Sequence, residues 1–499
     1  MVDANDGAAS TQDVKIAIVG GGLSGMSAAY TLKKAGVWAN VYEASGATGG
    51  RCRNDYTDGY QFFMGAGSTE PQWETTFSYL HELGIDHLVN REAGEAGIGF
   101  VTKGQIHILQ LGGSPADIMA SLAKFLPSFP ASVYVQGVRF LGLIGKYQKA
   151  LDFKGGNFTA LDELSDSSIY DWCQQNGYAD LCTYVLDPLV SNMVCANSHM
   201  VSMGHVIMLF SLMTGMCTIK GGMGVISESI YEQVKDRVHL NTKVEEVVVE
   251  DGKVLGVKID GELVEADHVI VALDAMRTLK LVPGLSQAQK DALASCNYSK
   301  VYYYQFGLEE PVEAIRHGAA FFAANEDNWL AGVSQSHEDE GKPIVLSQAR
   351  IERFDDLAAM TEEERTAKII SETQRVLPDF PSNPKIVKNY KWDLAVNLEG
   401  PGQFKAVNDL KANHMDDVEG LHLAGDYQFL IASTEGSMDA GRRRAEEILQ
   451  TMGVPVPTLR RPEPEPEAKK ESGKLPVAIG AAAGAAAVAA IAIAASHKK

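Results

Sequence analysis

The sequence predicts an α/β protein in which a doubly wound domain of the Rossmann type is interleaved with an α+β domain. Three observations support this fold class. The chain opens with two short β runs that flank a helical segment, within 15–43. A block of alternating apolar and polar residues, 238–273, contains turn signals and predicts several further strands. Between these blocks, from about 69 to 216, helical spacing of apolar residues dominates.

Composition limits the functions that are possible. The chain has 499 residues, 45% of them hydrophobic and 22% charged, which is enough for two or three domains and too apolar for a disordered protein. Its 44 basic and 64 acidic residues give a net charge of −20, and so acidic a surface repels phosphate backbones. We therefore expect no nucleic acid among its partners. Its six cysteines form no C-x-x-C pair and no zinc spacing, which indicates free thiols in a reducing compartment and no metal site.

The first motif is a glycine-rich turn between the opening strand and the helix. Gly20, Gly22 and Gly25 follow the β run directly. In this context the first glycine makes a tight turn, the second lets a pyrophosphate approach the backbone, and the third lets helix and strand pack closely. The helix N-terminus adds free N–H groups and a partial positive charge. Glu43 ends the next strand, where an acidic side chain can accept hydrogen bonds from an adenosine ribose. Together these features predict a dinucleotide site.

A second glycine pair makes that prediction more specific. Gly49, Gly50 and Arg51 come soon after Glu43, and a guanidinium there suits pyrophosphate oxygens. With this extension the sequence resembles the FAD-dependent flavin amine oxidase superfamily, which includes monoamine and polyamine oxidases, protoporphyrinogen oxidases and phytoene-type desaturases. The later stretches "IKGGMGVISESI", "VHLNTKVEEV" and "EGLHLAGDYQFLIASTEGSMDAGRRRAEEIL" are similar to the family's motifs as well. The resemblance covers residues 14 to about 450.

The resemblance implies FAD as the cofactor. Gly425 and Asp426 would lie near the ribityl chain and the pyrophosphate, and the backbone of Val244 would meet the adenine. The helix that begins at 435–438 would point its positive end at the pyrimidine edge of the flavin. Since no cysteine lies in 401–436, we expect FAD to be bound non-covalently. The full set of cofactor-binding residues expected is Gly20, Gly22, Leu23, Ser24, Gly25, Glu43, Gly50, Arg51, Gly65, Ala66, Val244, Gly425, Asp426, Gly436 and Met438.

The resemblance also divides the chain into interleaved segments. FAD-binding segments are expected at 14–69, 216–284 and 391–450. The substrate domain is expected to have a helical part at 70–215 and a sheet part at 285–390.

The two ends of the chain have a different composition. Residues 1–13 are expected to be disordered, and 451–474 is a Pro-, Glu- and Lys-rich stretch expected to be an extended linker. Beyond it, the uncharged, alanine-rich stretch 475–495 is long enough to cross a bilayer as a helix. Because no secretory signal precedes the body, this stretch predicts a C-terminal membrane anchor with the protein on the cytoplasmic face. The alternative is a soluble cytoplasmic protein.

The function implied by the resemblance is the two-electron oxidation of a small organic substrate, with oxygen or a quinone as the final acceptor. Lys300 falls on a lysine that the family's amine oxidases place near the flavin N5, where its charge could assist reaction with oxygen. It could also be a surface lysine at the end of a strand. Against an amine oxidase, Ser433 and Thr434 stand where one aromatic ring is expected, and only Phe404 lies near the position of the second.

The middle of the chain favours a different substrate. Two apolar stretches, 122–147 and 205–216, are either helical core or the wall of a wide pocket for a lipophilic molecule such as a polyene or a porphyrinogen. We therefore expect FAD-dependent dehydrogenation of a lipophilic small molecule by hydride transfer to the flavin N5. Amine oxidation that uses Lys300 is the alternative, and a membrane-tethered flavin-binding protein without turnover is a third.

Overall fold

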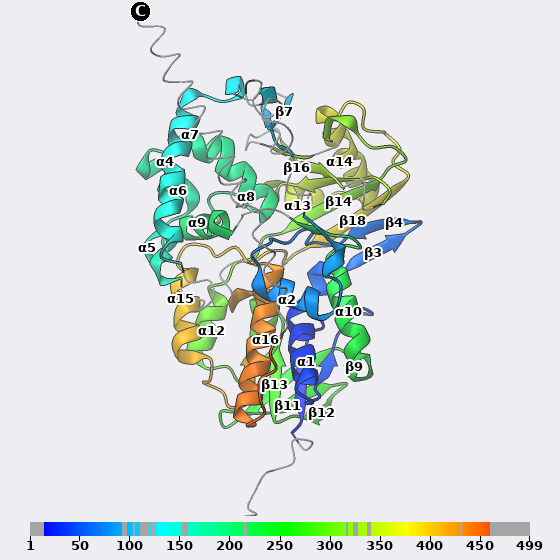
Figure 1. Cartoon of the computed structure of the whole chain (residues 1–499), viewed down its shortest axis with the longest axis vertical. Coiled ribbons are helices and arrows are strands. Elements are labelled where there is room, and N and C mark those ends of the chain that lie inside the picture. The colour runs from blue at the N-terminus through cyan, green and yellow to red at the C-terminus, as the bar shows by residue number, and fades with distance from the viewer. Residues whose placement is uncertain are drawn as a thin grey trace, which may run out of the picture.

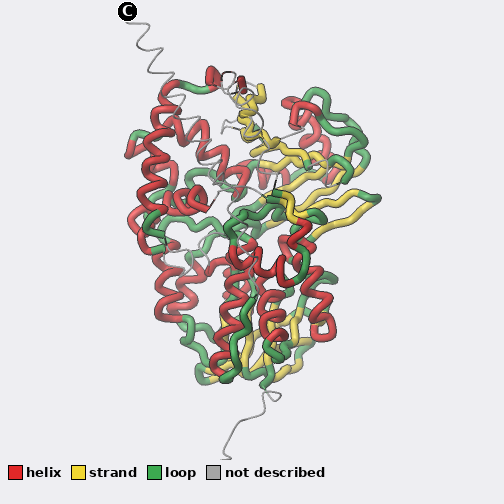
Figure 2. The backbone as a smooth tube through the Cα atoms, in the orientation of Figure 1, coloured by secondary structure: helices red, strands yellow, loops and turns green. Residues whose placement is uncertain are grey.

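The computed structural model describes residues 14–91, 97–102, 105–109, 120–121, 123, 126–151, 158–212, 217–315, 318–322, 328–336, 341–428 and 432–459. Helices and sheets are mixed throughout this part of the chain (Figure 1). One end of the molecule holds the first and last helices side by side. At the other end, helices gather on one side and strands on the other (Figure 2).

The described residues contain two main sheets, each the basis of one layer, and a five-stranded parallel sheet forms the first layer. Its strands come from three separated stretches of chain, which is why distant sequence motifs meet at one edge. The first strand is buried along its whole length, as its purely apolar sequence predicts for a strand covered on both faces. In sheet order the strands are β19 (Leu421–Leu423), β13 (His268–Val271), β1 (Ile16–Val19), β2 (Asn40–Tyr42) and β9 (Val238–His239).

Three helices cover this sheet: α1 (Leu23–Lys34), α10 (Gly224–Val234) and α16 (Thr434–Thr451). The first and last of them pack unusually closely, because a Cβ atom added at Gly441 would lie 1.9 Å from the carbonyl oxygen of Ser24. The Ser27 hydroxyl strengthens this contact by donating to the Met438 carbonyl at 2.8 Å. The two ends of the described chain therefore form one packed unit around the parallel sheet.

A seven-stranded sheet forms the second layer. Near one edge of this sheet, β14 lies between β18 and β17 and is antiparallel to both. A core that includes Tyr304, Phe306 and Phe322 packs on one face of it. In sheet order the strands are β18 (Ile386–Trp392), β14 (Val301–Gly307), β17 (Ile344–Ala349), β16 (Leu330–Gln335), β15 (Gly318–Phe322), β6 (Gly97–Thr102) and β7 (Gln105–Leu109).

Helices lie beside this second sheet (Figure 1). The apolar stretch at 205–216 forms most of α9 (Met203–Leu212), whose side chains are almost all buried in the main hydrophobic core. The described part of this stretch is therefore helical core. The helices of this region are α4 (Ala131–Gln148), α5 (Asp162–Ser165), α6 (Ile169–Asn176), α7 (Ala179–Leu181), α8 (Asp187–Met193) and α9.

The remaining elements connect the two layers or extend them. They are α2 (Glu74–Glu82), α11 (Ala275–Leu281), α12 (Gln287–Ala294), α13 (Phe354–Ala358), α14 (Glu362–Val376) and α15 (Gln403–Asp409), the hairpin β3 (Asn54–Thr57) and β4 (Tyr60–Phe63), the pair β5 (Val89–Asn90) and β8 (Thr218–Ile219), and the antiparallel sheet β10 (Val244–Glu250), β11 (Lys253–Ile259) and β12 (Glu262–Glu265).

The expected membrane anchor is not supported. Among the described residues, no helix combines the length and the apolar composition needed to cross a bilayer. The prediction of a single-pass anchor, and of a place on the cytoplasmic face of a membrane that depended on it, is therefore wrong. The stretch 475–495, from which that prediction was made, lies outside the described residues, as do the expected disordered segment 1–13 and, from residue 460 on, the expected linker.

Candidate cofactor and substrate site

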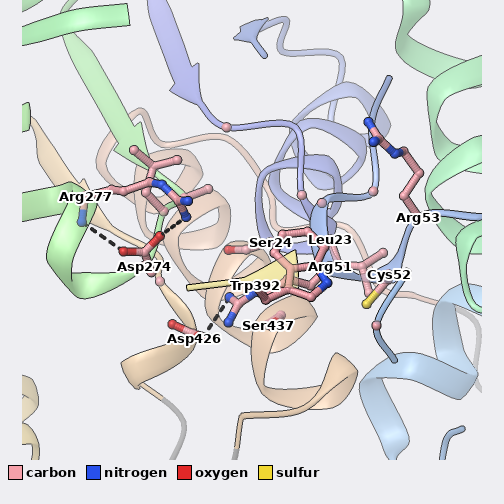
Figure 3. Close-up of a pocket in the computed structure, with 18 of the residues that line it drawn as sticks. Leu23, Ser24, Arg51, Cys52, Arg53, Asp274, Arg277, Trp392, Asp426 and Ser437 are labelled. Atoms are coloured by element: carbon pink, nitrogen blue, oxygen red, sulfur yellow. Dashed lines mark hydrogen bonds and ion pairs between the residues drawn. The ribbon is translucent and has the colours of Figure 1, made fainter. Parts of the chain in front are cut away.

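A cavity of about 970 Å³ lies between the two layers. The carboxyl ends of four parallel strands open into it, through Val19, Tyr42, Ala272 and Ala424 or their immediate neighbours. This is the edge at which open α/β sheets bind their ligands. The opposite wall comes from α8 and from strands of the seven-stranded sheet. Figure 3 shows part of the lining.

The glycine turn after β1 adopts the geometry that its sequence predicts. Gly20 has φ +103°, and a Cβ atom there would lie 2.7 Å from the Ala272 carbonyl oxygen. A Cβ atom on Gly25 would lie 2.0 Å from the Gly20 carbonyl oxygen, so this glycine lets helix and turn pack. Gly22 differs from both, because a Cβ atom there would meet nothing within 4 Å, and the residue lines the cavity. Its bare backbone leaves room for a ligand to approach.

Glu43 is held firmly at the end of β2. Its carboxylate accepts hydrogen bonds from the Gly21 N–H at 2.7 Å, and from the N–H and hydroxyl of Ser45 at 2.8 and 2.7 Å. The residue lines the cavity beside the glycine turn. A carboxylate has room for further donors, so the same group can accept hydrogen bonds from ribose hydroxyls.

Arg51 and Asp426 meet across the cavity from opposite ends of the sequence. Their side chains form an ion pair at 2.8 Å (Figure 3), and Arg51 also donates to the Ala395 carbonyl at 2.8 Å. The Tyr298 hydroxyl donates to the second carboxylate oxygen of Asp426 at 2.8 Å. Burial opposes the charge on Arg51, but the nearby Asp426 carboxylate outweighs it and raises the pKa of Arg51. The cavity therefore holds a permanently charged guanidinium.

The N-terminus of α16 points at the same cavity. Ser433 caps the helix by accepting from the Gly436 N–H at 3.0 Å, and Ser433, Thr434 and Ser437 line the cavity. Glu435 turns away and accepts the N–H groups of Thr75 and Thr76 at the start of α2, at 2.8 and 2.7 Å. Glu435 is the acidic residue in the first turn of α16, and its carboxylate is bound to α2. It therefore does not neutralise the partial positive charge that the N-terminus of α16 presents to the cavity.

Most of the residues expected to bind the cofactor lie together. Three do not reach the cavity: Gly25 packs inside the turn, Gly436 forms the helix cap, and Met438 lies fully buried in the core. Those that line the cavity are Gly20, Gly22, Leu23, Ser24, Glu43, Gly50, Arg51, Gly65, Ala66, Val244, Gly425 and Asp426.

Lys300 is placed away from this group. Residues alternate between the two faces of a strand, and Val301 and Tyr303 of β14 line the cavity. Lys300 consequently points to the other side of the sheet, where its exposed ammonium lies 5.5 Å from the centre of the Phe354 ring. The role expected for it near the flavin has no support in this geometry.

Aromatic side chains reach the cavity from positions that the sequence did not indicate. Phe404, the candidate for an aromatic wall, is fully buried and does not line the cavity. Tyr303 and Trp392, on neighbouring strands, do line it. In a strand, every second side chain points to the same face, so Val301 and Tyr303 share one face and Tyr302 lies on the other. This alternation is the sequence signal that could have located the face toward the cavity.

Other lining residues carried no sequence signal. Asn192 and Met193 end α8, and Cys195 follows it with a left-handed φ of +55°, which is uncommon for a residue other than glycine. At the other end of the cavity, Asp274 caps α11 by accepting from the Arg277 N–H at 2.9 Å (Figure 3). Only the fold brings these residues together.

The parallel sheet, the glycine turn and the cavity at the carboxyl ends of the strands are typical of a dinucleotide-binding protein, and comparison with known proteins identifies the family. A family model described as "Flavin containing amine oxidoreductase" matches residues 23–449. The chain belongs to this family and is an FAD-dependent oxidoreductase.

Relatives in the family act on different substrates. Protoporphyrinogen oxidase 2 of Arabidopsis thaliana is 26% identical over 194 residues, which is 38% of this chain and 34% of the relative. The chain thus matches about a third of the length of that relative. An L-amino-acid oxidase of Bothrops pauloensis is 26% identical over 322 residues, 59% of each chain. The matched relatives therefore leave the substrate open.

Solved structures share the fold. A double mutant of putrescine oxidase has a TM-score of 0.71 at 20% identity and covers 88% of this chain and 99% of that one. The cyclohexylamine oxidase of Brevibacterium oxydans has a TM-score of 0.69 at 16% identity and covers 88% of this chain and 100% of its own. These likenesses confirm a mixed α/β fold of the flavin amine oxidase type.

Proposed function

We propose that the cavity holds FAD non-covalently and that the chain uses it to dehydrogenate a small lipophilic molecule by hydride transfer to the flavin N5. One observation carries this proposal. The glycine turn, the Arg51–Asp426 pair and the positive end of α16 come from distant parts of the sequence and converge on one cavity. These groups are complementary to a pyrophosphate, a ribose and an electron-rich ring.

The residues present fit the cofactor. Gly22 leaves backbone space, Arg51 supplies a guanidinium for phosphate oxygens, and Glu43 supplies a carboxylate for ribose hydroxyls. When bound, FAD supplies the acceptor for the hydride. The chain's own task is to bind and orient the substrate and to exclude water from it.

Non-covalent binding is supported by the chemistry of the thiols that line the cavity. Burial raises the pKa of Cys52 to about 11 and that of Cys195 to about 12. Both side chains are therefore protonated near neutral pH and are poor nucleophiles. Neither is disposed to attack a flavin ring.

The order of the parallel sheet supports a Rossmann-type FAD domain. Its strands belong to the FAD-binding segments proposed at 14–69, 216–284 and 391–450, whereas most of the seven-stranded sheet and the helices α4 to α9 belong to the substrate segments at 70–215 and 285–390. The strand β18 crosses the proposed boundary between 390 and 391, because Trp392 still pairs with Val301 in the seven-stranded sheet.

A lipophilic substrate is favoured by the lining on the substrate side. Met193, Val301, Tyr303 and Trp392 present apolar or aromatic surface to the cavity. The matched protoporphyrinogen oxidases point the same way. Amine oxidation is the second candidate, because the matched L-amino-acid oxidases extend over more of the chain. The final acceptor we propose is oxygen or a quinone.

Anaerobic titration tests this proposal. The purified protein should show the absorbance of an oxidised flavin near roughly 450 nm. Protoporphyrinogen or a polyene should bleach it without oxygen, while benzylamine and L-leucine should not. Readmission of oxygen or of a soluble quinone should restore the colour and identify the acceptor. If only benzylamine or L-leucine bleached the flavin, amine oxidation would replace the dehydrogenation of a lipophilic molecule as the favoured function.

A further inference from the structure

Charge is distributed unevenly around the cavity. Among the described residues, every charged side chain that lines the cavity belongs to a proposed FAD-binding segment, the set being Glu43, Arg51, Arg53, Lys243, Glu245, Asp274, Arg277, Lys280 and Asp426. The described lining residues of α8, of the residues after it and of the seven-stranded sheet are all uncharged. We call these the neutral wall: Asn192, Met193, Cys195, Val301, Tyr303, Gln348 and Trp392.

The neutral wall is one face of three adjacent strands. In the antiparallel register, Tyr303 of β14 is opposite Gln348 of β17, and Val301 is opposite Trp392 of β18. Directly opposed residues point to the same face, with Cβ atoms about 5 Å apart. Tyr303 and Gln348 therefore form a polar pair on this face of the strands, beside Val301 and Trp392.

The end of α8 closes one side of this wall. A Cβ atom on Gly332 would lie 2.4 Å from the Asn192 side-chain nitrogen, so the absence of a side chain there lets the helix approach the sheet. Cys195 follows in a left-handed conformation and also lines the cavity. Burial raises the pKa of its thiol to about 12, so it too stays neutral.

The amide of Gln348 has a fixed orientation. Its Nε2 donates to the Ser191 carbonyl at 2.7 Å, and a flipped amide would place two oxygens against each other there. Within the described residues no hydrogen bond is made by its other end, the carbonyl Oε1. Gln348 thus offers an acceptor to whatever occupies the cavity.

Tyr303 offers the matching donor. Its ring packs edge-on against Phe63, with centroids 5.9 Å apart, which holds its direction. In the described part of the chain its hydroxyl has no hydrogen-bond partner, although the side chain is half-buried. Burial raises the pKa of this phenol, so it remains a neutral O–H donor.

We propose that the neutral wall selects an uncharged substrate group that pairs a hydrogen-bond acceptor with a donor, as an amide, a lactam or a pyrrole beside a carbonyl does. Tyr303 would donate to its acceptor and Gln348 would accept from its N–H. An ammonium or a carboxylate would lose its hydration against this wall without meeting an opposite charge, which disfavours both. This inference rests on the proposed function, because it describes the substrate side of the same cavity.

Benzamide, benzylamine and benzoate test the inference, since they share a ring and differ in charge. Each would be titrated into the FAD-loaded protein while the change in flavin absorbance is followed. We expect benzamide to bind at least about tenfold more tightly than either charged probe, the minimum that an unpaired buried charge implies. Equal or tighter binding of benzylamine or benzoate, or no binding of benzamide, would overturn it.

Two variants assign the effect to residues. Tyr303→Phe should weaken benzamide binding about three- to tenfold, the usual value of one hydrogen bond, and leave toluene binding unchanged. Tyr302→Phe is the matched control. Because Tyr302 points to the opposite face of the strand, this substitution should change neither benzamide binding nor toluene binding. Gln348→Glu should reverse the preference towards benzylamine. If that variant fails to fold, the Tyr303→Phe result decides, and an unchanged benzamide affinity there would refute the proposal.

These failures are distinguishable from a failure of the proposed function. Protein that carries no flavin after reconstitution would contradict the proposed function itself. Protein that carries flavin but binds the three probes equally would contradict only the inference about the neutral wall.

Discussion

The two sides of the cavity differ in how they contact a ligand. The side on which we propose that FAD binds, called here the FAD side, offers backbone geometry and permanent charges: the glycine turn, Arg51, and the N-terminus of α16. The side proposed for the substrate offers the uncharged side chains of the neutral wall. A backbone site tolerates few residue types at each position, so it leaves a motif in the sequence. A wall built of side chains tolerates many residue types, so it leaves no motif.

The largest effect should come from the packing that assembles the FAD side. Gly441→Ala places a Cβ atom 1.9 Å from the Ser24 carbonyl oxygen, and the α1–α16 contact has no room to relax. We expect a loss of about 4 kcal/mol or more in the free energy of unfolding, with little folded protein recovered. Urea denaturation followed by circular dichroism measures it.

A helical glycine elsewhere is the matched control for that substitution. Gly142, on the exposed side of α4, would meet nothing within 4 Å with a Cβ atom added. Gly142→Ala should stabilise the protein by up to about 1 kcal/mol through helix propensity. If the two substitutions had similar effects, the close contact between the first and last helices would be refuted.

The next largest effect concerns the charges of the FAD side. Arg51→Met leaves the buried Asp426 carboxylate without its cation and removes the guanidinium that we propose binds the phosphates. We expect FAD affinity to fall by about 3–5 kcal/mol, more than a hundredfold. Adding Asp426→Asn should recover part of the loss, because the uncompensated charge disappears. FAD fluorescence quenching measures the affinity, and an unchanged value for Arg51→Met would show that the guanidinium does not contact the cofactor.

A smaller effect concerns the parallel sheet itself. His268 and His422 lie on neighbouring strands with ring nitrogens 3.1 Å apart. Burial, assisted by the charge of a protonated His268 and of Arg444, lowers the pKa of His422 to about 3. The unfolded chain therefore takes up a proton below about pH 6.5 that the folded chain refuses, so stability falls as the pH drops from about 6.5 towards 3.

Denaturation at two pH values measures this dependence. Between pH 7 and 5 we expect the free energy of unfolding to fall by about 1–2 kcal/mol on account of this pair. His422→Phe should remove most of that fall. An equal fall in the variant would show that other groups cause the acid sensitivity.

The smallest expected effect is at Lys300. Because its side chain is exposed on the far face of β14, Lys300→Met should change the rate of flavin reoxidation by oxygen less than about twofold, within the usual range of surface substitutions. Stopped-flow absorbance of the reduced, FAD-loaded protein measures this rate. A tenfold decrease would instead favour the catalytic role that the sequence resemblance implied.

Much of the FAD side was predictable from sequence. Gly20, Gly22 and Glu43 are positioned by local chain geometry, and a strand–turn–helix pattern is enough to locate them. Met438 does not line the cavity, and the sequence could not predict this, because it indicates where α16 begins but not which of its residues face the cavity and which face the core.

The substrate side was not predictable in the same way. Lys300 directly precedes Val301, the first residue of β14, and that single step separates a side chain on the far side of the sheet from one that lines the cavity. Cys195 and Asn192 reach the cavity only because Gly332 lets α8 approach the sheet, a contact between residues far apart in the chain. The membrane anchor failed for another reason, since it was inferred from composition alone.

The most direct test of the account is whether FAD occupies the cavity and depends on its charged side. Wild-type protein and Arg51→Met should be reconstituted with FAD, freed of excess, and precipitated with acid, and the flavin in each supernatant measured. We predict FAD in an amount equal to that of the protein for the wild type, released completely into the supernatant, and very little for the variant. Wild-type protein without flavin, flavin that stays with the precipitate, or equal amounts in the two proteins would contradict the account.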